Sequence, residues 1–588
     1  MLKRFTAAAI STVLSVSAVL PCTVNASDNN KAKSCPYIVS GNLKTDADAA
    51  VIITATASAE TKTGSLGVSI NYTLSPDGTL TIKGFGATNR FNASPFGADA
   101  EKVLRVIFEN EGNGITAIGR GLFMGCTNLK EITVPETVAT IEGYLFDGCT
   151  SLKKAVINGG SNNIGEFIFN GCTALEELTL PYAGFSLESV NAEKPSASLT
   201  NLFSAASYDN TYQVTNSYGS VRYIPESLKS ITITGGKNIP AFAFEGMSKV
   251  TSVTVPDSVE FVGQNAFLEC SSLEYFKMPS AITYIDDSAF AGCAKIDVDI
   301  PQKTTFIGMN AFAGCKSIKE INVPETVKIL GTYSFSNCTS LKKAVVKGCN
   351  NGIADFVFNG CTALEELTLP YAGFSLDSVN TEKAASLTDL FSTTAYDNTY
   401  QVINSYGSIR YIPKSLVDIT VTDGKSIPAF AFEGLSGVKN FTLPNTAETV
   451  GDKAFADCSG IENVFYPDKE EKWNAVTIGS SNEAIDGKVR FLGSDNRYTG
   501  AVMKLGDVNS DGLIDAVDAS MVLAEYAKLS TKATGSFTTI KQITADVNRN
   551  GIIDAVDASN ILAYYAYIST EKDAPVTMEK FIADRSKK

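Results

Sequence analysis

The chain has 588 residues, of which 44% are hydrophobic and 19% charged, so several domains with sizeable cores are expected. A net charge of −14 and a pI near 4.8 argue against a nucleic-acid partner, because phosphate binding requires basic surface. The absence of histidine excludes histidine-based triads and histidine-ligated zinc, but it leaves open enzymes that use carboxylates alone.

The N-terminal segment has the pattern of a secretory signal. Lys3 and Arg4 precede an apolar stretch over residues 7–20, which is short for a bilayer span. Small or branched residues then lead to Ala26, where a polar run begins. We therefore expect residues 1–26 to be a signal peptide and the mature protein to be secreted and extracellular.

A lipoprotein anchor at Cys22 is the alternative, but Pro21 departs from the small residue that such processing favours. Residues 27–60 are rich in Ser, Ala, Thr and Lys, which is typical of a linker. No later segment is long and apolar enough to predict a membrane span.

A small β domain is expected over residues 61–102. Apolar residues alternate on both sides of Asp77-Gly78, and a DG pair between alternating runs indicates a β-hairpin. This domain precedes the repeats and would lead into them.

The middle of the chain repeats a frame of about 23 residues that contains Phe, Cys and Leu at fixed offsets and then alternating apolar residues. Two further repeats carry Met247 and Leu435 in the cysteine slot. The cysteines that occupy this slot are Cys126, Cys149, Cys172, Cys270, Cys293, Cys315, Cys338, Cys361 and Cys458.

A larger duplication overlies these repeats. The spacing of the first three slots, from Cys126 to Cys172, recurs from Cys315 to Cys361, and the sequence GCTALEELTLPYAGFSL occurs twice. Each copy runs into an aromatic-rich insertion, one over residues 182–238 and the other over residues 371–426. We expect the insertion aromatics to pack on the repeats, although exposed rings could also bind sugars or proteins.

Alternation with a period of two predicts one short strand in each repeat. A single short strand cannot bury its face alone, whereas stacked coils can. The sequence therefore predicts an α/β solenoid with a parallel β-sheet on one side, built from about eleven repeats of about 23 residues. The Phe and Cys slots should form internal ladders with one rung per coil.

Twelve cysteines in a secreted chain suggest disulfides. However, parallel side chains stacked about 4.8 Å apart suit small apolar filling better than a bridge. We therefore expect buried free thiols at the slots, and the sequence does not assign Cys35 or Cys349.

The repeated frame resembles the BspA-like leucine-rich repeats of bacteria over residues 103–465. The stretch before it is similar to the β lead-in of such proteins, and residues 466–497, with the only tryptophan at Trp473, resemble their C-terminal cap. This resemblance implies surface attachment or protein binding by analogy.

Near the C-terminus an acidic phrase occurs twice, as DVNSDGLIDAVD over residues 507–518 and as DVNRNGIIDAVD over residues 546–557. Both copies match the D-x-[DN]-x-[DN]-G calcium loop, with Asp in place of Glu at position twelve. Glycine at position six provides the sharp turn, and the oxygens suit a hard cation.

The twelve expected calcium ligands share positions one, three, five, seven, nine and twelve, with a backbone carbonyl at seven and a water-mediated contact at nine. The loops therefore predict two calcium ions. The ligands are Asp507, Asn509, Asp511, Leu513, Asp515 and Asp518 in the first loop and Asp546, Asn548, Asn550, Ile552, Asp554 and Asp557 in the second.

A helical pattern follows each loop, but none precedes the first. Two such loop–helix units resemble a type I dockerin over residues 502–570. The resemblance implies a small all-α calcium-binding module that docks on a cohesin of a scaffoldin in a cell-surface cellulosome. The last residues, 571–588, are polar and are expected to fray.

The resemblance also implies that partner contacts come from loop positions ten and eleven and from the following helix. The matching residues are Ala516, Val517, Leu523, Ala524, Lys528, Ala555, Val556, Leu562, Ala563 and Tyr567. The Ala-Val pair departs from the hydroxyl pair common in that family, which predicts a more apolar cohesin specificity. The alternative for Leu523 and Leu562, and the one we expect, is core packing between the two helices.

Three functions are open for the solenoid. It could bind protein or plant-polysaccharide ligands on an extended face, it could be a carbohydrate-active enzyme, or it could be an inert spacer. No carboxylate pair recurs at a spacing typical of catalysis, so we expect a non-catalytic protein that supports polysaccharide degradation.

Overall fold

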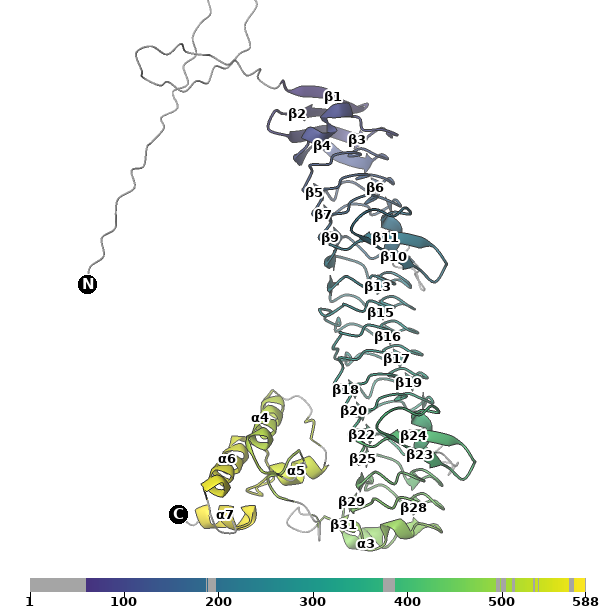
Figure 1. The fold of residues 1–588 in the computed structure, drawn as a ribbon, viewed down its shortest axis with the longest axis vertical. Helices are drawn as coiled ribbons and strands as arrows, with labels where there is room; N and C mark the ends of the chain where they lie inside the picture. The colour runs from purple at the N-terminus through teal and green to yellow at the C-terminus, as the bar shows by residue number, and fades with distance from the viewer. Residues whose placement is uncertain are drawn as a thin grey trace, which may run out of the picture.

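The computed structural model describes residues 60–186, 188, 197–373, 386–492, 498, 504–509, 513–531, 535–537, 539–570 and 576–586. Within these residues, a long solenoid is followed by a small helical domain that lies beside the C-terminal end of the stack (Figure 1). The predicted signal peptide and all but the last residue of the predicted linker, with Cys22 and Cys35, lie outside the described residues.

The N-terminal strands form the first layer of the stack. Strands β1 (Lys62–Gly67), β2 (Ile70–Leu74) and β3 (Thr79–Ala87) pair in an antiparallel manner, so the hairpin predicted at the DG pair is confirmed. Strand β3 then pairs in parallel with β4 (Arg105–Ile118), which continues into the coils. The N-terminal strands and the first coils therefore share one sheet.

One side of the solenoid carries parallel strands of three or four residues, which we call the main face. In β5 the side chains of Ile132 and Val134 are buried and the other two face outward, as the alternation predicted. The main-face strands are β5 (Glu131–Val134), β7 (Lys154–Ile157), β9 (Glu177–Leu180), β12 (Ser230–Ile233), β14 (Ser252–Thr254), β18 (Glu320–Val323), β20 (Lys343–Val346), β22 (Glu366–Leu369), β25 (Asp418–Val421), β27 (Asn440–Thr442), β29 (Asn463–Tyr466) and β31 (Val489–Phe491).

A second ladder of two-residue parallel strands runs along another side of the coils, where the sequence analysis expected only one sheet. Most of these strands bury one apolar residue and leave the preceding residue more exposed, whereas β26 buries both of its residues and β30 exposes both. These strands are β6 (Thr140–Ile141), β8 (Asn163–Ile164), β13 (Asn238–Ile239), β15 (Phe261–Val262), β16 (Tyr284–Ile285), β17 (Phe306–Ile307), β19 (Ile329–Leu330), β21 (Gly352–Ile353), β26 (Ser426–Ile427), β28 (Thr449–Val450) and β30 (Thr477–Ile478).

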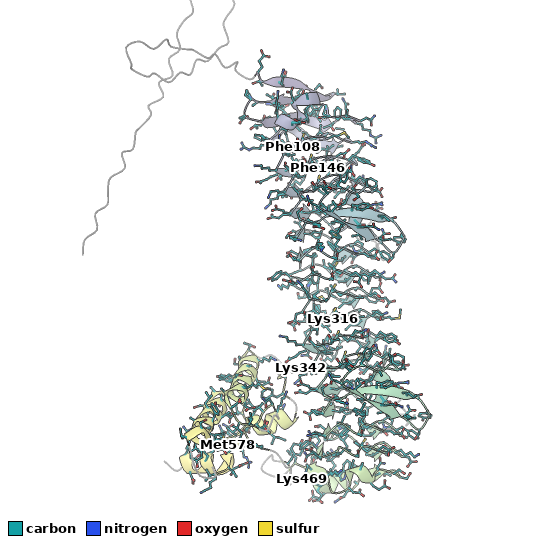
Figure 2. All side chains as sticks on the ribbon, viewed as in Figure 1. Phe108, Phe146, Lys316, Lys342, Lys469 and Met578 are labelled. Atoms are coloured by element: carbon teal, nitrogen blue, oxygen red, sulfur yellow. The ribbon has the colours of Figure 1, made fainter. Side chains whose placement is uncertain are left out.

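The predicted internal ladders of Phe and Cys are both present. The rings of Phe267 and Phe290 stack with centroids 5.0 Å apart, and Phe290 stacks on Phe312 at 5.4 Å. Each thiol after the first in a run donates to a phenylalanine carbonyl of the preceding coil, as from Cys293 Sγ to Phe267 O at 3.1 Å. Among the described residues, all ten cysteines are buried and free, so the prediction of free thiols is confirmed at the nine slots, and Cys349, which the sequence left unassigned, is free as well. Figure 2 shows the side chains along the stack, with Phe146 in its N-terminal part.

The predicted count of eleven repeats is too low, because the solenoid has about 17 turns. Some turns lack the cysteine slot that was counted. At the C-terminal end, β31 adds to the ladder without such a slot. The first insertion also contributes a rung, because the Phe203 ring lies tilted against that of Phe169, with centroids 5.9 Å apart, between slot-bearing coils.

The two insertions have the same structure. Each contains a short 3₁₀ helix, Leu199–Leu202 or Leu387–Leu390, followed by a projecting hairpin. The hairpins are β10 (Thr211–Thr215) with β11 (Val221–Pro225), and β23 (Thr399–Ile403) with β24 (Ile409–Pro413) (Figure 1). Some aromatic side chains of the insertions are packed inside and others are exposed, which are the two possibilities that the sequence left open. Tyr182 and Phe203 are buried, whereas Tyr218 at the hairpin tip is exposed.

The C-terminal end of the stack is covered by α3 (Glu470–Trp473). The Trp473 ring is buried and packs against Tyr466 with centroids 5.1 Å apart. An apolar cover of this kind shields the open end of a solenoid from water. In the part of the chain that the structure describes, no helix combines the length and apolar character needed to cross a bilayer.

The helical domain contains α4 (Ala516–Ser530), α5 (Thr539–Ala545), α6 (Ala555–Thr570) and α7 (Met578–Arg585). Its small core lies between α4 and α6, and α7 packs against α6. The expectation that residues 571–588 fray is wrong for α7: Met578 is buried and the Tyr564 hydroxyl donates to Val576 O at 2.8 Å. Three apolar residues of this segment pack in the small core, namely Met578, Phe581 and Ile582. The expectation of fraying rested on the polar residues around them.

Candidate calcium centre and docking face

The first acidic loop is organised around Asp518, whose side chain is fully buried. One of its oxygens accepts hydrogen bonds from the backbone N–H groups of Val508 at 2.8 Å and Asn509 at 3.1 Å, and the other accepts from Asp515 N–H at 2.9 Å. The Asp515 carboxylate accepts from Val517 N–H at 2.7 Å and caps α4. The acid at position twelve therefore ties the start of the loop to the start of the helix.

The other predicted ligands of this loop are placed unequally. Asp507 is buried, Asn509 is half-buried, and Leu513 is exposed. Asp511 lies outside the described residues. The structure thus brings the two ends of the first loop together. The central residues 510–512 of that loop lie outside the described residues.

The second loop has the same arrangement at its end. The buried Asp557 accepts from the N–H groups of Asn548 at 3.2 Å and Asp554 at 3.0 Å. Asp554 accepts from Val556 N–H at 2.7 Å. Both copies of the repeated phrase therefore fold alike at positions nine, eleven and twelve.

The beginning of the second loop is fully described and consists of successive side-chain acceptors. The two Asp546 oxygens accept from the N–H groups of Asn550 at 3.0 Å and Gly551 at 2.8 Å. Asn548 Oδ1 also accepts from Asn550 N–H at 3.0 Å, and Asn550 Oδ1 accepts from Ile552 N–H at 2.7 Å. Gly551 has a φ of +83°, which a side chain would disfavour, so the glycine expected at position six is needed.

The electrostatics of the second loop suit a cation. Burial raises the pKa of Asp557 to about 6, against the hydrogen bonds from Asp554 and Asn548, and the nearby charges of Asp546 and Asp554 raise that pKa as well. Gathering three carboxylates around a buried position is unfavourable without a positive charge. Carboxylate, amide and carbonyl oxygens are the ligands that calcium prefers, so these residues fit a calcium ion.

Paired positions on the two loop–helix units form an exposed apolar surface. Val517 and Val556 are 52% and 55% exposed, and Leu523 and Leu562 are 44% and 43% exposed. The expectation that the two leucines pack between the helices is therefore wrong. The buried stripe of each helix instead passes through the preceding residue, Val522 or Ile561, because the core contacts follow an i, i+3 spacing that leaves the leucine outside.

The remaining predicted partner residues are less uniform. Ala563 and Tyr567 are half-buried, and the Tyr567 ring lies 5.2 Å from that of Phe581 in α7. Lys528 is exposed, and its Nζ lies 3.7 Å from a Glu320 oxygen on the solenoid. The predicted partner residues that are exposed alanines are Ala516, Ala524 and Ala555.

Sequence reasoning missed a buried acid outside the loops. Glu525 accepts from the N–H groups of Ser536 at 2.6 Å and Phe537 at 3.0 Å, and from Ser536 Oγ at 2.5 Å. It therefore fixes the segment between the two units to α4. An acid among the apolar positions of a helix face was the only signal available in the sequence.

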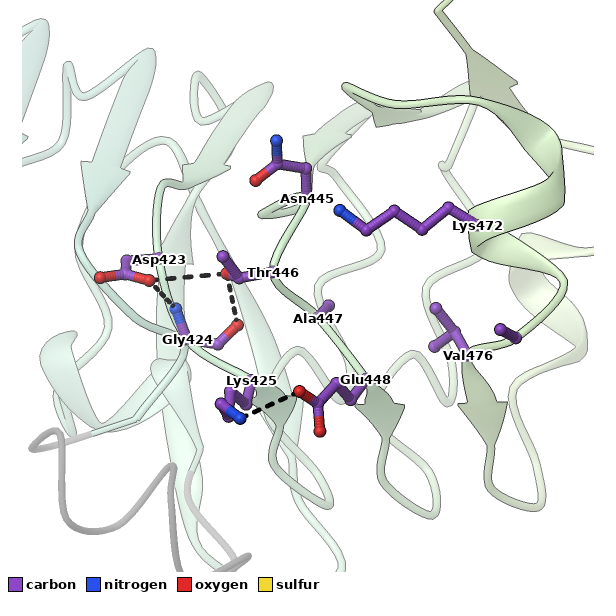
Figure 3. Close-up of a pocket in the computed structure, with 10 residues that line it drawn as sticks. Asp423, Gly424, Lys425, Asn445, Thr446, Ala447, Glu448, Lys472 and Val476 are labelled. Atoms are coloured by element: carbon purple, nitrogen blue, oxygen red, sulfur yellow. Dashed lines mark hydrogen bonds and ion pairs between the residues drawn. The ribbon is translucent and has the colours of Figure 1, made fainter.

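The solenoid carries a pocket of about 440 Å³ near its C-terminal cap (Figure 3). Its charged groups are engaged in local contacts: Lys425 lies 3.0 Å from Glu448, and Asp423 accepts from Gly424 N–H at 2.7 Å. Lys472 pairs with Asp468 at 2.9 Å. Such contacts stabilise the turns, and both carboxylates that line the pocket, Asp423 and Glu448, take part in them.

Comparison with family models identifies both parts of the chain. A model of the BspA type leucine rich repeat region matches residues 105–205, 222–298, 296–406 and 409–481 in six copies. A model of the dockerin type I domain, which is a calcium-binding module, matches residues 505–564. No curated protein matches the sequence.

Several solved structures are similar to the chain. A leucine-rich repeat protein from Bacteroides ovatus is 18% identical over 68% of this chain and 81% of its own, with a TM-score of 0.30. A leucine rich cell surface protein from Faecalibacterium prausnitzii is 18% identical over 71% and 98%, with a TM-score of 0.22. A leucine-rich repeat protein from Eubacterium ventriosum is 17% identical over 72% and 94%, with a TM-score of 0.24.

The family assignment rests on the repeat model, whose matches span more than half of the chain. The chain belongs to the BspA-type leucine-rich repeat proteins and carries a C-terminal dockerin type I domain.

Proposed function

We propose that this is a secreted, extracellular, non-catalytic component of a cellulosome. Its dockerin binds two calcium ions and docks on a cohesin of a scaffoldin, and its solenoid presents a face to protein or plant-polysaccharide ligands. The observation that carries the proposal is the buried acid at position twelve of each loop, Asp518 and Asp557, beside a paired exposed apolar surface.

In this proposal the first ion is held by Asp507, Asn509, Asp511, Asp515 and Asp518 with the Leu513 carbonyl. The second is held by Asp546, Asn548, Asn550, Asp554 and Asp557 with the Ile552 carbonyl. When bound, calcium supplies the positive charge that the clustered carboxylates require. Since an unfolded loop has no preformed site, calcium binding and folding of this domain are coupled.

The two loops differ in charge, because the first has four carboxylates among the six positions and the second has three. We expect the first loop to bind calcium more tightly. Calorimetry of Asp518→Ala should then leave only the weaker site, and Asp557→Ala only the tighter one. Equal affinities of the remaining sites in the two variants would contradict this order.

The docking face is built from Val517, Leu523, Val556 and Leu562 with the neighbouring alanines. The near-equal exposure of the paired positions supports two docking orientations related by a half-turn. Val517→Asp alone should then retain cohesin binding through the second unit, whereas Val517→Asp with Val556→Asp should lose it. Loss of binding in the single variant would rule out the second orientation.

The experiment that tests the main proposal is capture of the full chain on immobilised cohesins with calcium and with EDTA. We expect retention with calcium and release by EDTA, together with loss of helical circular dichroism from the C-terminal domain. A C-terminal domain equally ordered in EDTA, or indifferent to every cohesin tested, would overturn the proposal.

Exposed aromatics support a ligand-binding role for the solenoid over a spacer role. Tyr218 and Tyr406 occupy equivalent tips of the two hairpins, and both rings are exposed. Pull-down of plant fibre or host proteins with the full chain should weaken in the Tyr218→Ala, Tyr406→Ala double variant. An enzyme would instead release sugars from polysaccharide, which we do not expect.

A further inference from the structure

The dockerin contacts its own solenoid through charged groups. In Figure 1, α5 lies beside β22 and β25 of the main face. The Lys541 ammonium of α5 pairs with Glu366, whose other oxygen lies 2.9 Å from Lys343 Nζ. Lys528 of α4 lies 3.7 Å from Glu320. The dockerin thus approaches three successive charged residues, Glu320, Lys343 and Glu366, which we call the C-terminal face.

The internal duplication places the same three charges elsewhere on the stack. Glu131, Lys154 and Glu177 occupy the equivalent positions of the first copy and pair across β5, β7 and β9 as their counterparts do across β18, β20 and β22. The Lys154–Glu177 distance is 2.8 Å, against 2.9 Å for Lys343–Glu366. We call Glu131, Lys154 and Glu177 the N-terminal face.

The three side chains are the same in the two faces, but their exposure differs. The side chains of Lys154 and Glu177 are 48% and 57% exposed, whereas those of Lys343 and Glu366 are 11% and 5% exposed. A neighbouring pair acts as an internal control, because it is about equally exposed in both copies: 58% and 48% for Lys153–Glu176, against 61% and 41% for Lys342–Glu365. The difference at the faces therefore comes from the dockerin that covers one of them.

The surroundings of the N-terminal face resemble those of the covered one in part, with Ser230 beside Glu177 where Asp418 lies beside Glu366. A cleft of about 650 Å³ that begins at β14, two strands along the sheet from β9, is lined by Thr254, Pro256 and the exposed Tyr275. The matching cleft beside the C-terminal face is lined by Thr442 and Pro444. The residues that the dockerin contributes to this second cleft are Leu529, Gln542, Ile543, Asp546, Gly551, Ile552 and Ile553.

We propose that the N-terminal face binds the dockerin of a second copy of this chain. The lysine of α5 would pair with Glu177 as Lys541 pairs with Glu366, and Tyr275 would meet the apolar residues that line the other cleft. Charge complementarity supports this occupant, since the N-terminal face presents two carboxylates around one ammonium and the covering surface presents two lysines.

Such a contact joins different surfaces of two copies, so it closes into a ring where the rotation between copies allows it and otherwise extends head to tail. Within one chain, the linkage gives the dockerin a millimolar effective concentration at its own C-terminal face. The intact chain is therefore expected to hold its dockerin on its own solenoid, and assembly follows when that contact is broken.

The test is sedimentation velocity of the full chain in calcium over a range of concentrations. Glu366→Lys repels Lys541 and frees the dockerin. We expect this variant to self-associate at least about tenfold more tightly than the unaltered chain, which corresponds to about 1.4 kcal/mol. Adding Glu177→Lys to the Glu366→Lys variant should restore a monomeric chain. Lys541→Glu also frees the dockerin but places a carboxylate against Glu366 or Glu177 of either face, so this control should remain monomeric.

Circular dichroism establishes that each variant is folded, and the Lys541→Glu control separates specific pairing from exposure of a freed domain. A Glu366→Lys chain that stays monomeric at all concentrations would overturn the proposal. Association that persists in the Glu366→Lys, Glu177→Lys double variant, or that occurs equally in Lys541→Glu, would also overturn it. No cohesin is present, so these results are independent of the cohesin-binding experiment.

Discussion

Asp418 of β25 provides a prediction whose size follows from its surroundings. Burial raises the pKa of its carboxyl to about 6, and the charge of Glu366 on β22 raises it as well. A hydrogen bond from Asn440 Nδ2 on β27, at 2.8 Å, and the charges of Lys541 on α5 and Lys343 on β20 lower that pKa. The corresponding residue in the first copy is the uncharged Ser230.

The pKa of an aspartate in an unfolded chain is about 3.9, so the folded state holds its proton more tightly. Between about pH 4 and pH 6 the folded state binds more protons than the unfolded state, and stability falls as the pH rises through this window. A difference of about two pKa units corresponds to at most about 3 kcal/mol, all of it lost above about pH 7.

Asp418→Asn keeps the shape and the acceptor for Asn440 but removes the charge. We expect the variant to be more stable than the unaltered chain at pH 7.5, by up to about 3 kcal/mol, and nearly equal to it at about pH 4. Thermal unfolding followed by far-ultraviolet circular dichroism at both pH values measures the difference.

Asp257→Asn is the matched control, because that side chain is 74% exposed and its neutralisation should change stability by less than about 0.5 kcal/mol at either pH. The reasoning would be refuted if Asp418→Asn showed the same pH dependence as the unaltered chain. A destabilised variant at pH 7.5 would show that attraction to the two lysines outweighs burial.

The remaining predictions concern the interior and the C-terminal helix. Phe290→Ala should cost about 3–5 kcal/mol because the buried ring stacks on both neighbours, and urea unfolding should show no comparable loss for the exposed Tyr275→Ala. Burial suppresses thiolate formation, so a thiol reagent should leave the ten described cysteines unreacted in the folded chain and modify them all in denaturant; fast labelling without denaturant would contradict this. Truncation after residue 570 removes the partners of Tyr564 and should lower the melting temperature of the dockerin in calcium, whereas removing only the last two residues should not.

The two parts of the chain play complementary roles in this account. The dockerin provides a calcium-dependent attachment, and the solenoid provides an elongated surface with two equivalent hairpins and one open charged face. While α5 contacts the main face, Val517 and Val556 remain exposed, so in this account the two docking surfaces overlap only at Lys528.

Local repetition determined much of this protein. The short period of the repeats requires stacking, because no single coil has a core of its own, and the fixed Phe and Cys offsets place those side chains in ladders. The calcium loops were likewise readable, since glycine at position six and oxygen-bearing residues at fixed offsets reflect chemistry within one short, continuous segment.

Contacts between distant residues were decided only by the tertiary structure. Leu523 and Leu562 look like core residues in the sequence, yet the stripe through Val522 and Ile561 is buried instead, because helix rotation depends on what the opposite helix presents. Likewise, Glu177 and Glu366 occupy the same sequence context, but only Glu366 is covered. That difference depends on where a separate domain, encoded far along the chain from either glutamate, packs against the stack.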